Sequence, residues 1–293
     1  MKSDVVSPCM HIPRVLSALR SCAPDEVIWP LVAAAFRAPL IKRYPDVPVV
    51  FLLGQTGTFK TALAMVFQRF FLAPFYADKG FLGREPLAFF STDKADVILW
   101  ATDAARDMIV VIDDYAMWSS RKSANRQRAG AEKVLLGGGA DDLRARCLIL
   151  GTGDTCDFSP SVRRNLFLIE LDTPRTCVAK RRPLPVAQRK SRRTEWGESC
   201  VNKTALGALQ KMSEEGVLAG LMMDYVDWLA HFDDSLMHCP DASNLDMAGS
   251  LNLGTQYFFR WLRDRGATLD DAMEVEAISA VQRAGDLSAM VTG

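Results

Sequence analysis

Residues 54–61 have the types and spacing of a loop that binds phosphate groups, and they read Gly-Gln-Thr-Gly-Thr-Phe-Lys-Thr. Glycines let consecutive backbone N–H groups converge on phosphate oxygens, and the N-terminus of a following helix adds the positive end of its dipole. In the pattern G-x-x-x-x-G-K-[ST], the lysine reaches the β- and γ-phosphates of ATP and the last hydroxyl binds Mg²⁺. We therefore expect ATP and Mg²⁺ as cofactors, with Lys60 on the phosphates and Thr61 on the metal. The expected nucleotide-binding residues are Gly54, Gln55, Thr56, Gly57, Thr58, Phe59, Lys60 and Thr61.

One residue departs from this pattern, because Phe59 stands where a glycine usually precedes the lysine. A side chain fits there if it points away from the nucleotide into the hydrophobic core, and we expect this of Phe59. The alternative for the whole stretch is a glycine turn that joins a strand to a helix and leaves Lys60 in solvent. The rest of the chain has to decide between the two.

Two acidic residues, Asp113 and Asp114, follow a run of apolar residues at 108–112. At the carboxyl end of a strand beside a phosphate-binding loop, the first carboxylate holds Mg²⁺ through a water molecule and the second orients or deprotonates the attacking water. We predict the metal role for Asp113 and the water-positioning role for Asp114, which is one methylene shorter than the glutamate that is common there. Otherwise, an acidic pair after a strand forms a turn or caps a helix.

Three more polar residues lie next to later apolar runs. Thr152 follows one run, and we predict that it senses the γ-phosphate, with Asp154 in reserve. Arg163 and Arg164 precede another run. They are either surface charges or the source of a guanidinium group that reaches the γ-phosphate of an adjacent subunit.

The spacing of apolar residues predicts the elements that hold these side chains. The run 49–53 begins with two β-branched valines, as in a buried parallel strand, and the loop then opens a helix. Further strands are expected at 87–90, 108–112, 147–150 and 166–171, with a helix through about 93–105. We predict an α/β fold in which helices flank a parallel sheet, followed by a helical C-terminal domain. The expected domains are a helical lead-in at 1–47, an ATPase core at 48–172, a basic linker at 173–200 and an acidic helical domain at 201–293.

Charge is distributed unevenly along the chain, although the formal net charge of its 293 residues is zero. Residues 1–172 carry 21 Lys and Arg against 19 Asp and Glu, residues 173–200 carry 8 against 2, and residues 201–293 carry 6 against 14. The basic segment is either a solvated connector or a contact for nucleic-acid phosphates. The basic residues at 119–128 and the glycine triplet at 137–139 form either a surface loop or one that projects toward DNA or a neighbouring subunit.

Composition excludes several classes of protein. Hydrophobic residues make up 49% of the chain and charged residues 24%, which is typical of a globular protein and not of a disordered one. The seven cysteines are scattered without a C-x-x-C pair, so neither a disulfide framework nor a zinc site is indicated. The N-terminus lacks a signal-peptide pattern, and the longest apolar stretch is too short to span a bilayer. We expect a cytoplasmic protein without a membrane partner.

Taken together, these motifs resemble a family of helicase-like P-loop ATPases that is encoded beside primases in bacterial mobile elements and phages. The similarity includes Phe59-Lys60-Thr61, Ser91-Thr92 before a helix, the run 104–115 that ends Val-Ile-Asp-Asp-Tyr, the strand and polar end at 148–154, and Ser161-Val162-Arg163-Arg164. The helical tail at 206–229 is also similar. The resemblance implies an additional-strand P-loop NTPase of the AAA+ or superfamily 3 helicase type, generally assembled as a homo-oligomeric ring.

Three functions are compatible with the sequence. The first is an Mg²⁺-dependent ATPase that forms a ring, such as a hexamer, and works as a helicase-like motor on DNA during replication of a mobile genetic element or phage. The second is an ATP-controlled AAA+ assembly or loading factor that recruits a replication or recombination partner to DNA with slow or no hydrolysis. The third is a binding protein with a degenerate loop, an alternative that Phe59 suggests.

Overall fold

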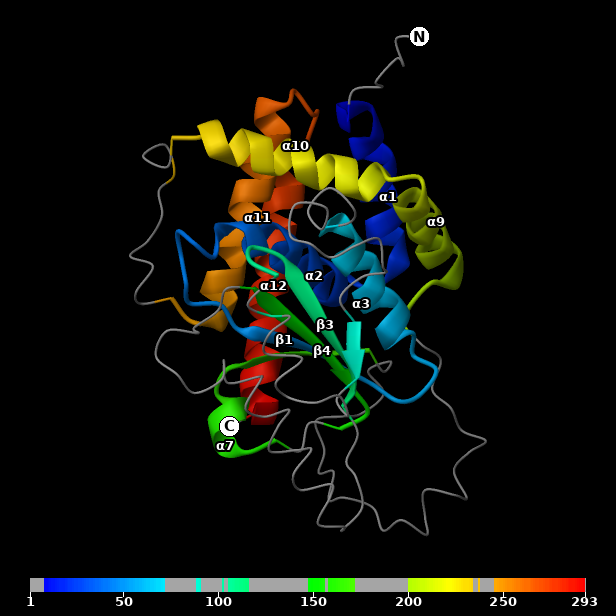
Figure 1. The fold of residues 1–293 in the computed structure, drawn as a ribbon, viewed down its shortest axis with the longest axis vertical. Coiled ribbons are helices and arrows are strands. Elements are labelled where there is room, and N and C mark those ends of the chain that lie inside the picture. Colours follow the sequence, from blue (N-terminus) through cyan, green and yellow to red (C-terminus); the bar gives the residue numbers. More distant parts are fainter. Residues whose placement is uncertain are drawn as a thin grey trace.

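The fold is an α/β arrangement in which helices flank a parallel sheet (Figure 1). The computed structural model describes residues 8–71, 88–90, 102, 105–115, 147–155, 158–171, 200–233, 237 and 245–292. Within these ranges, five strands form one sheet in the order β2-β3-β4-β1-β5, and every neighbouring pair is parallel. The predicted combination of a parallel sheet with flanking helices is confirmed.

Each strand forms from one of the apolar runs of the sequence. The strands are β1 Val49–Leu53, β2 Ala88–Phe90, β3 Ile109–Tyr115, β4 Leu148–Gly153 and β5 Leu166–Glu170. β1 pairs with β4 on one side and with β5 on the other, so β4 lies between β1 and β3. Because all pairs are parallel, the carboxyl ends of β1, β3 and β4 lie at one edge of the sheet. The polar residues at the ends of these strands are therefore brought to that edge.

Two strands extend beyond the ends that their apolar runs predict. The sequence predicts a strand end at Ile112, but β3 continues through Asp113 and Asp114 to Tyr115. It predicts another end at Leu150, but β4 continues to Gly153. Tyr115 pairs with Gly153 of β4, and the register shifts between Ile112 and Tyr115. Hydrogen bonding between the two strands, and not the apolar pattern, sets these ends. The acidic pair consequently lies inside β3 and not after it.

Helices from the two ends of the chain pack together, and two further helices come from its middle. They are α1 Ile12–Cys22, α2 Asp25–Arg37, α3 Lys60–Gln68, α7 Pro160–Arg163, α9 Lys203–Glu214, α10 Val217–His231, α11 Met247–Asp264 and α12 Asp271–Thr292, with 3-10 helices η1 Pro8–His11, η2 Ala38–Leu40 and η3 Arg69–Phe71. α2 packs against α11 and α12, and α1 packs against α9. α12 also packs on β5. The N-terminal helices, the C-terminal helices and the sheet therefore share one hydrophobic core.

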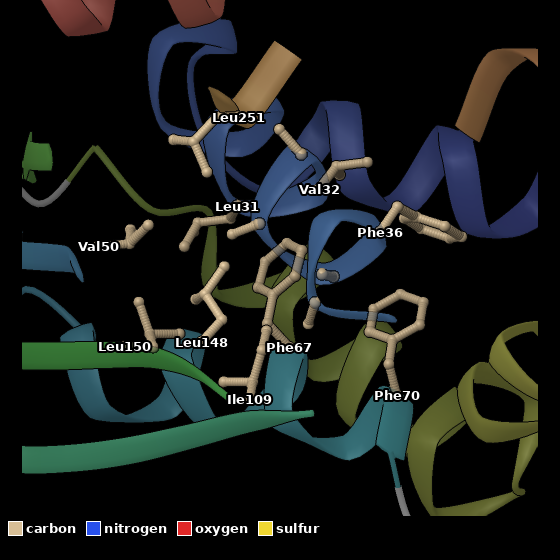
Figure 2. Packing of buried hydrophobic residues seen from close by; sticks show 14 of the residues in the cluster. Leu31, Val32, Phe36, Val50, Phe67, Phe70, Ile109, Leu148, Leu150 and Leu251 are labelled. Carbon is tan, nitrogen blue, oxygen red and sulfur yellow. The ribbon is translucent and has the colours of Figure 1, made fainter. Parts of the chain in front are cut away.

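This core joins one face of the sheet to α2 and α3. Figure 2 shows Val50 of β1 and both Leu148 and Leu150 of β4 pointing toward Leu31 of α2, with Phe67 of α3 beside them. All five side chains are buried. Burial of this apolar surface is the main favourable term that holds the sheet and the helices together.

The opposite face of β1 is covered by aromatic rings, because successive residues of a strand point to opposite faces. The Phe51 ring meets Phe158 edge-on with 5.1 Å between ring centroids, and Phe158 stacks on Tyr115 with 4.3 Å between centroids. Gly151 of β4 leaves room for this arrangement, since a Cβ atom there would lie 2.5 Å from Cδ2 of Phe51. These contacts brace β1, β3 and β4 against one another.

A buried hydroxyl ties α12 to the edge strand β5. Oγ of Ser288 accepts a hydrogen bond from the N–H of Leu168 at 2.8 Å and donates one to the carbonyl of Leu166 at 3.1 Å. In the part of the chain that the structure describes, β5 pairs only with β1. Ser288 therefore satisfies backbone groups that an edge strand leaves without a neighbouring strand.

Several predicted features lie outside the described residues: most of the helix at 93–105, the basic and glycine-rich stretches at 119–128 and 137–139, and all of the basic linker at 173–200 except its last residue. The domain boundaries drawn from the sequence stay predictions. Among the helices that are described, none combines the length and apolar character needed to cross a membrane.

Gly254 of α11 permits the close approach of α11 to α2. A Cβ atom at this position would lie 2.1 Å from the carbonyl oxygen of Ala33 and 2.8 Å from the backbone nitrogen of Arg37. Both are backbone atoms, so only a movement of the helices relieves the clash. We expect Gly254→Ala to lower the free energy of unfolding by about 3 kcal/mol, measured by urea denaturation.

Gly220→Ala in α10 is the matched control, because a Cβ atom there meets nothing within 4 Å. The higher helix propensity of alanine should raise the free energy of unfolding by up to about 1 kcal/mol. Equal stability of the two variants would contradict the packing of α2 against α11.

Candidate functional site

The loop between β1 and α3 is a tight turn that is anchored to β4. The N–H of Gly54 donates to the carbonyl of Gly153 at 3.2 Å. Thr58 closes the turn, because its N–H and its hydroxyl both donate to the carbonyl of Gln55, at 3.2 and 2.8 Å. Gly57 has a φ of 95°, a left-handed conformation that favours glycine. The turn ends at the N-terminus of α3, where the helix dipole favours an anion.

Lys60 is the first residue of α3, and its ammonium group is held inside this turn. The side chain is 9% exposed. Nζ donates to the carbonyls of Gly54 at 2.6 Å and Gln55 at 3.0 Å, and to Oδ1 of Asp154 at 2.7 Å. A lysine ammonium has three N–H donors, so these bonds occupy all of them. Lys60 is therefore not the solvated lysine of an ordinary glycine turn.

Phe59 is the N-cap of α3 and has a φ of 65°, in the left-handed region. Its ring is half-buried and packs against the hydrophobic core. Nζ of Lys203, at the start of α9, lies 5.1 Å from the ring centroid, which is the geometry of a cation–π contact. The packing and this contact offset the strain of a left-handed residue that carries a Cβ atom. The role of Lys203 was not apparent from the sequence, because no local pattern relates residues so far apart.

Three oxygen-bearing side chains meet at the carboxyl edge of the sheet. Oδ1 of Asp113 accepts a hydrogen bond from the hydroxyl of Thr61 at 2.7 Å and another from the hydroxyl of Thr152 at 2.6 Å. Thr152 is buried, whereas Thr61 is exposed. The structure thus brings together residues from α3, β3 and β4 that the sequence had proposed for one site. Asp114 lies in β3 beside Asp113, and its side chain is outside the described residues.

The donor set at this edge suits Mg²⁺ better than a metal with an all-protein cage. Across the described residues, no group of three or more His, Cys, Asp and Glu side chains is placed to hold a metal ion. Thr61 and Asp113 instead offer a hydroxyl and a carboxylate next to each other. Mg²⁺ typically takes one or two protein oxygens and completes its shell with waters and substrate phosphates. The residues present therefore fit the predicted ion.

Arg163 and Arg164 lie on the short helix α7. Nε of Arg163 donates to the carbonyl of Phe158 at 2.9 Å, and Nε of Arg164 donates to the carbonyl of Pro160 at 3.4 Å. Arg164 is exposed and Arg163 is half-buried. An action on the nucleotide of a neighbouring subunit involves a second chain, so this role stays a prediction.

Asp154 contributes more to the site than the sequence indicated. Besides its bond to Lys60, Oδ2 of Asp154 accepts a hydrogen bond from the hydroxyl of Thr56 at 3.1 Å. The carboxylate thus holds the tip and the end of the loop together. Its position just after a strand at the same sheet edge was the signal, but the sequence did not show that it would pair with Lys60.

Comparisons with known proteins give little further information about the function of this site. A scan against models of protein families found no match, and a search of curated proteins found none. Among solved structures, the chain is similar to one titled "SCCmec type IV Cch - active helicase", with a TM-score of 0.45 and 11% sequence identity. The alignment covers 90% of this chain and 48% of that chain, so this chain spans about half the length of that protein. A likeness at this level does not identify a function, which must be inferred from the side chains.

The conformation of Phe59 can be tested by two substitutions that both remove its ring. The left-handed backbone costs a residue with a Cβ atom roughly 1–2 kcal/mol, and glycine avoids this cost. We therefore expect Phe59→Gly to have a free energy of unfolding about 1 kcal/mol higher than that of Phe59→Ala, measured by urea denaturation. Equal stability of the two variants would mean that residue 59 is not left-handed.

Proposed function

We propose that this chain is an Mg²⁺-dependent ATPase with the fold of an additional-strand P-loop NTPase. The observation that carries the proposal is the grouping of a buried lysine at a helix N-terminus with a hydroxyl and a carboxylate 2.7 Å apart, those of Thr61 and Asp113. The position of β4 between β1 and β3 also supports it, because an additional-strand enzyme inserts a strand between the phosphate-loop strand and the acidic strand.

Each residue has a distinct part in the proposed reaction. Backbone N–H groups of the loop other than those of Gly54 and Thr58, together with the Lys60 ammonium, bind the β- and γ-phosphates, and Thr61 and Asp113 hold Mg²⁺. When bound, Mg²⁺ neutralises charge that develops on the phosphate oxygens. Asp114 orients the attacking water.

Thr152 has a positioning role in this scheme. Its hydroxyl donates to Asp113 at 2.6 Å and so fixes the direction of that carboxylate. Because Thr152 is buried in β4, the carboxylate is held by the sheet and not by a flexible loop. We also keep Thr152 as the candidate that senses the γ-phosphate, since it lies one strand away from the acidic pair.

For the biological role, we propose a helicase-like motor that acts on DNA as a homo-oligomeric ring during replication of a mobile genetic element or phage. In such a ring, Arg163 or Arg164 reaches the γ-phosphate of the adjacent subunit, and the exposed Arg164 is better placed to leave its own chain. The alternative is an ATP-controlled assembly or loading factor that recruits a partner to DNA with slow or no hydrolysis. Asp114 favours this alternative, because its carboxylate is shorter than that of glutamate.

Steady-state ATP hydrolysis, with and without single- and double-stranded DNA, tests the enzymatic proposal. We expect turnover that DNA raises several-fold, and a loss of about 100-fold or more in Lys60→Ala and in Asp113→Ala. Lys60→Ala removes a cation that stabilises the transition state, and Asp113→Ala removes a carboxylate that would hold Mg²⁺. Lys211→Ala, at an exposed lysine of α9, is the matched control and should keep wild-type turnover. If Lys60→Ala hydrolysed ATP as fast as Lys211→Ala, the proposed site would be wrong. ATP binding without turnover would favour the assembly factor.

Mixing two inactive variants tests whether an arginine acts between subunits. Arg164→Ala subunits keep Lys60, and Lys60→Ala subunits keep Arg164, so a mixed assembly contains some interfaces with both groups. We expect each variant alone to be inactive and the mixture to recover part of the turnover. The same experiment with Arg163→Ala identifies which arginine is used. Arg20→Ala, on the exposed side of α1, is the control and should keep wild-type turnover on its own. Absence of recovery with both arginines would contradict a role between subunits.

A further inference from the structure

Asp154 accepts hydrogen bonds from two side chains of the loop that is expected to bind phosphate. Its two carboxylate oxygens accept hydrogen bonds from Lys60 at 2.7 Å and from Thr56 at 3.1 Å. Both donors belong to the segment that should receive the nucleotide. A carboxylate and a phosphate are both anions with several acceptor oxygens, so each suits the same donors.

Lys60 cannot serve both anions with the bonds that it makes here. Its three N–H donors are already used by Gly54, Gln55 and Asp154. The two carbonyl bonds fix the lysine inside the loop, whereas the third bond goes to a side chain outside the loop, that of Asp154 just after β4. A phosphate that binds Nζ must therefore replace one of these three acceptors, and the carboxylate is the one that is not part of the loop backbone.

Asp154 is free to move away when it is replaced. Its side chain is 45% exposed, in contrast to 9% for Lys60, so a displaced carboxylate can be hydrated. It lies one residue beyond the end of β4, where the ladder no longer holds the backbone. Exchange of Asp154 for a phosphate then needs only a local change at the strand end.

We propose that Asp154 holds the place of a nucleotide phosphate on Lys60 and Thr56, and that incoming nucleotide must displace it. Asp154 is thereby a positioning residue that lowers nucleotide affinity through its charge. When no nucleotide is bound, it also keeps Lys60 and the loop tip in the geometry that binds phosphate. This inference rests on the proposed nucleotide site, and it concerns ligands that place a phosphate on Lys60, namely nucleoside di- and triphosphates and pyrophosphate.

Isothermal titration calorimetry of the full chain with Mg·ATP and with magnesium pyrophosphate tests the inference. Asp154→Asn keeps the shape and an acceptor oxygen but removes the charge, and Asp154→Ala removes both. A hydrogen bond to a charged group is stronger than one between neutral groups, so we expect both variants to bind both ligands about five- to tenfold more tightly than the wild type. Asp227→Asn, at an exposed position of α10, is the matched control and should bind as the wild type does.

The Lys60→Ala background separates displacement from a general electrostatic effect. If Asp154 competes for Lys60, adding Asp154→Asn to Lys60→Ala should leave the residual affinity unchanged, whereas a mere loss of negative charge near the site would still tighten binding. Wild-type binding with equal or weaker binding by Asp154→Asn and Asp154→Ala would overturn this inference and leave the nucleotide site intact. Absence of binding by every variant and the wild type would overturn both proposals.

Discussion

Parallel strand pairing is the constraint on which the rest of the site depends. Because β1, β3 and β4 run in the same direction, their carboxyl ends reach one edge, and residues separated by many positions in sequence become neighbours. Gly54 donates to Gly153 across β1 and β4, and Tyr115 pairs with Gly153 across β3 and β4. Gly153 thus links the loop to the acidic strand. A shift of one residue in either ladder would turn Asp113 or Thr152 to the other face of the sheet.

Packing of the helices against the strands holds this edge of the sheet in place. α2 is buried between the sheet and the C-terminal helices, and Gly254 lets α11 approach it closely. Ser288 of α12 bonds to the backbone of β5, which pairs with β1. The chain of contacts from the C-terminal helices to β1 means that the loop is positioned by both ends of the protein. A rigid base of this kind suits the proposed nucleotide site, in which the Lys60 ammonium and the Asp113 carboxylate would keep their directions.

Sequence reasoning predicted the grouping of Lys60, Thr61, Asp113 and Thr152, because an apolar run that precedes a polar residue marks the same edge of a parallel sheet each time. It did not predict where β3 ends, since the ladder with β4 extends the strand past its last apolar residue. It did not predict that Asp154 pairs with Lys60, which depends on how the chain turns after β4.

The surroundings of Phe59 were predictable only in part. The departure from glycine suggested that the side chain lies against the core, and the ring does pack there. The left-handed backbone and the contact with Lys203 depend on the placement of α9, which no pattern around residue 59 encodes. The roles of Arg163 and Arg164 depend on a second chain, and therefore neither the sequence nor the fold of one chain decides them.

A crystal structure of the protein with Mg²⁺ and a non-hydrolysable ATP analogue tests the central claim most directly. We predict that the β- and γ-phosphates lie against backbone N–H groups of the loop between Gly54 and Lys60, that Nζ of Lys60 contacts a phosphate oxygen, and that Mg²⁺ lies between the phosphates and the side chains of Thr61 and Asp113. A nucleotide bound elsewhere, or a loop that stays without phosphate at saturating ligand, would contradict the assignment of this edge of the sheet as the nucleotide site.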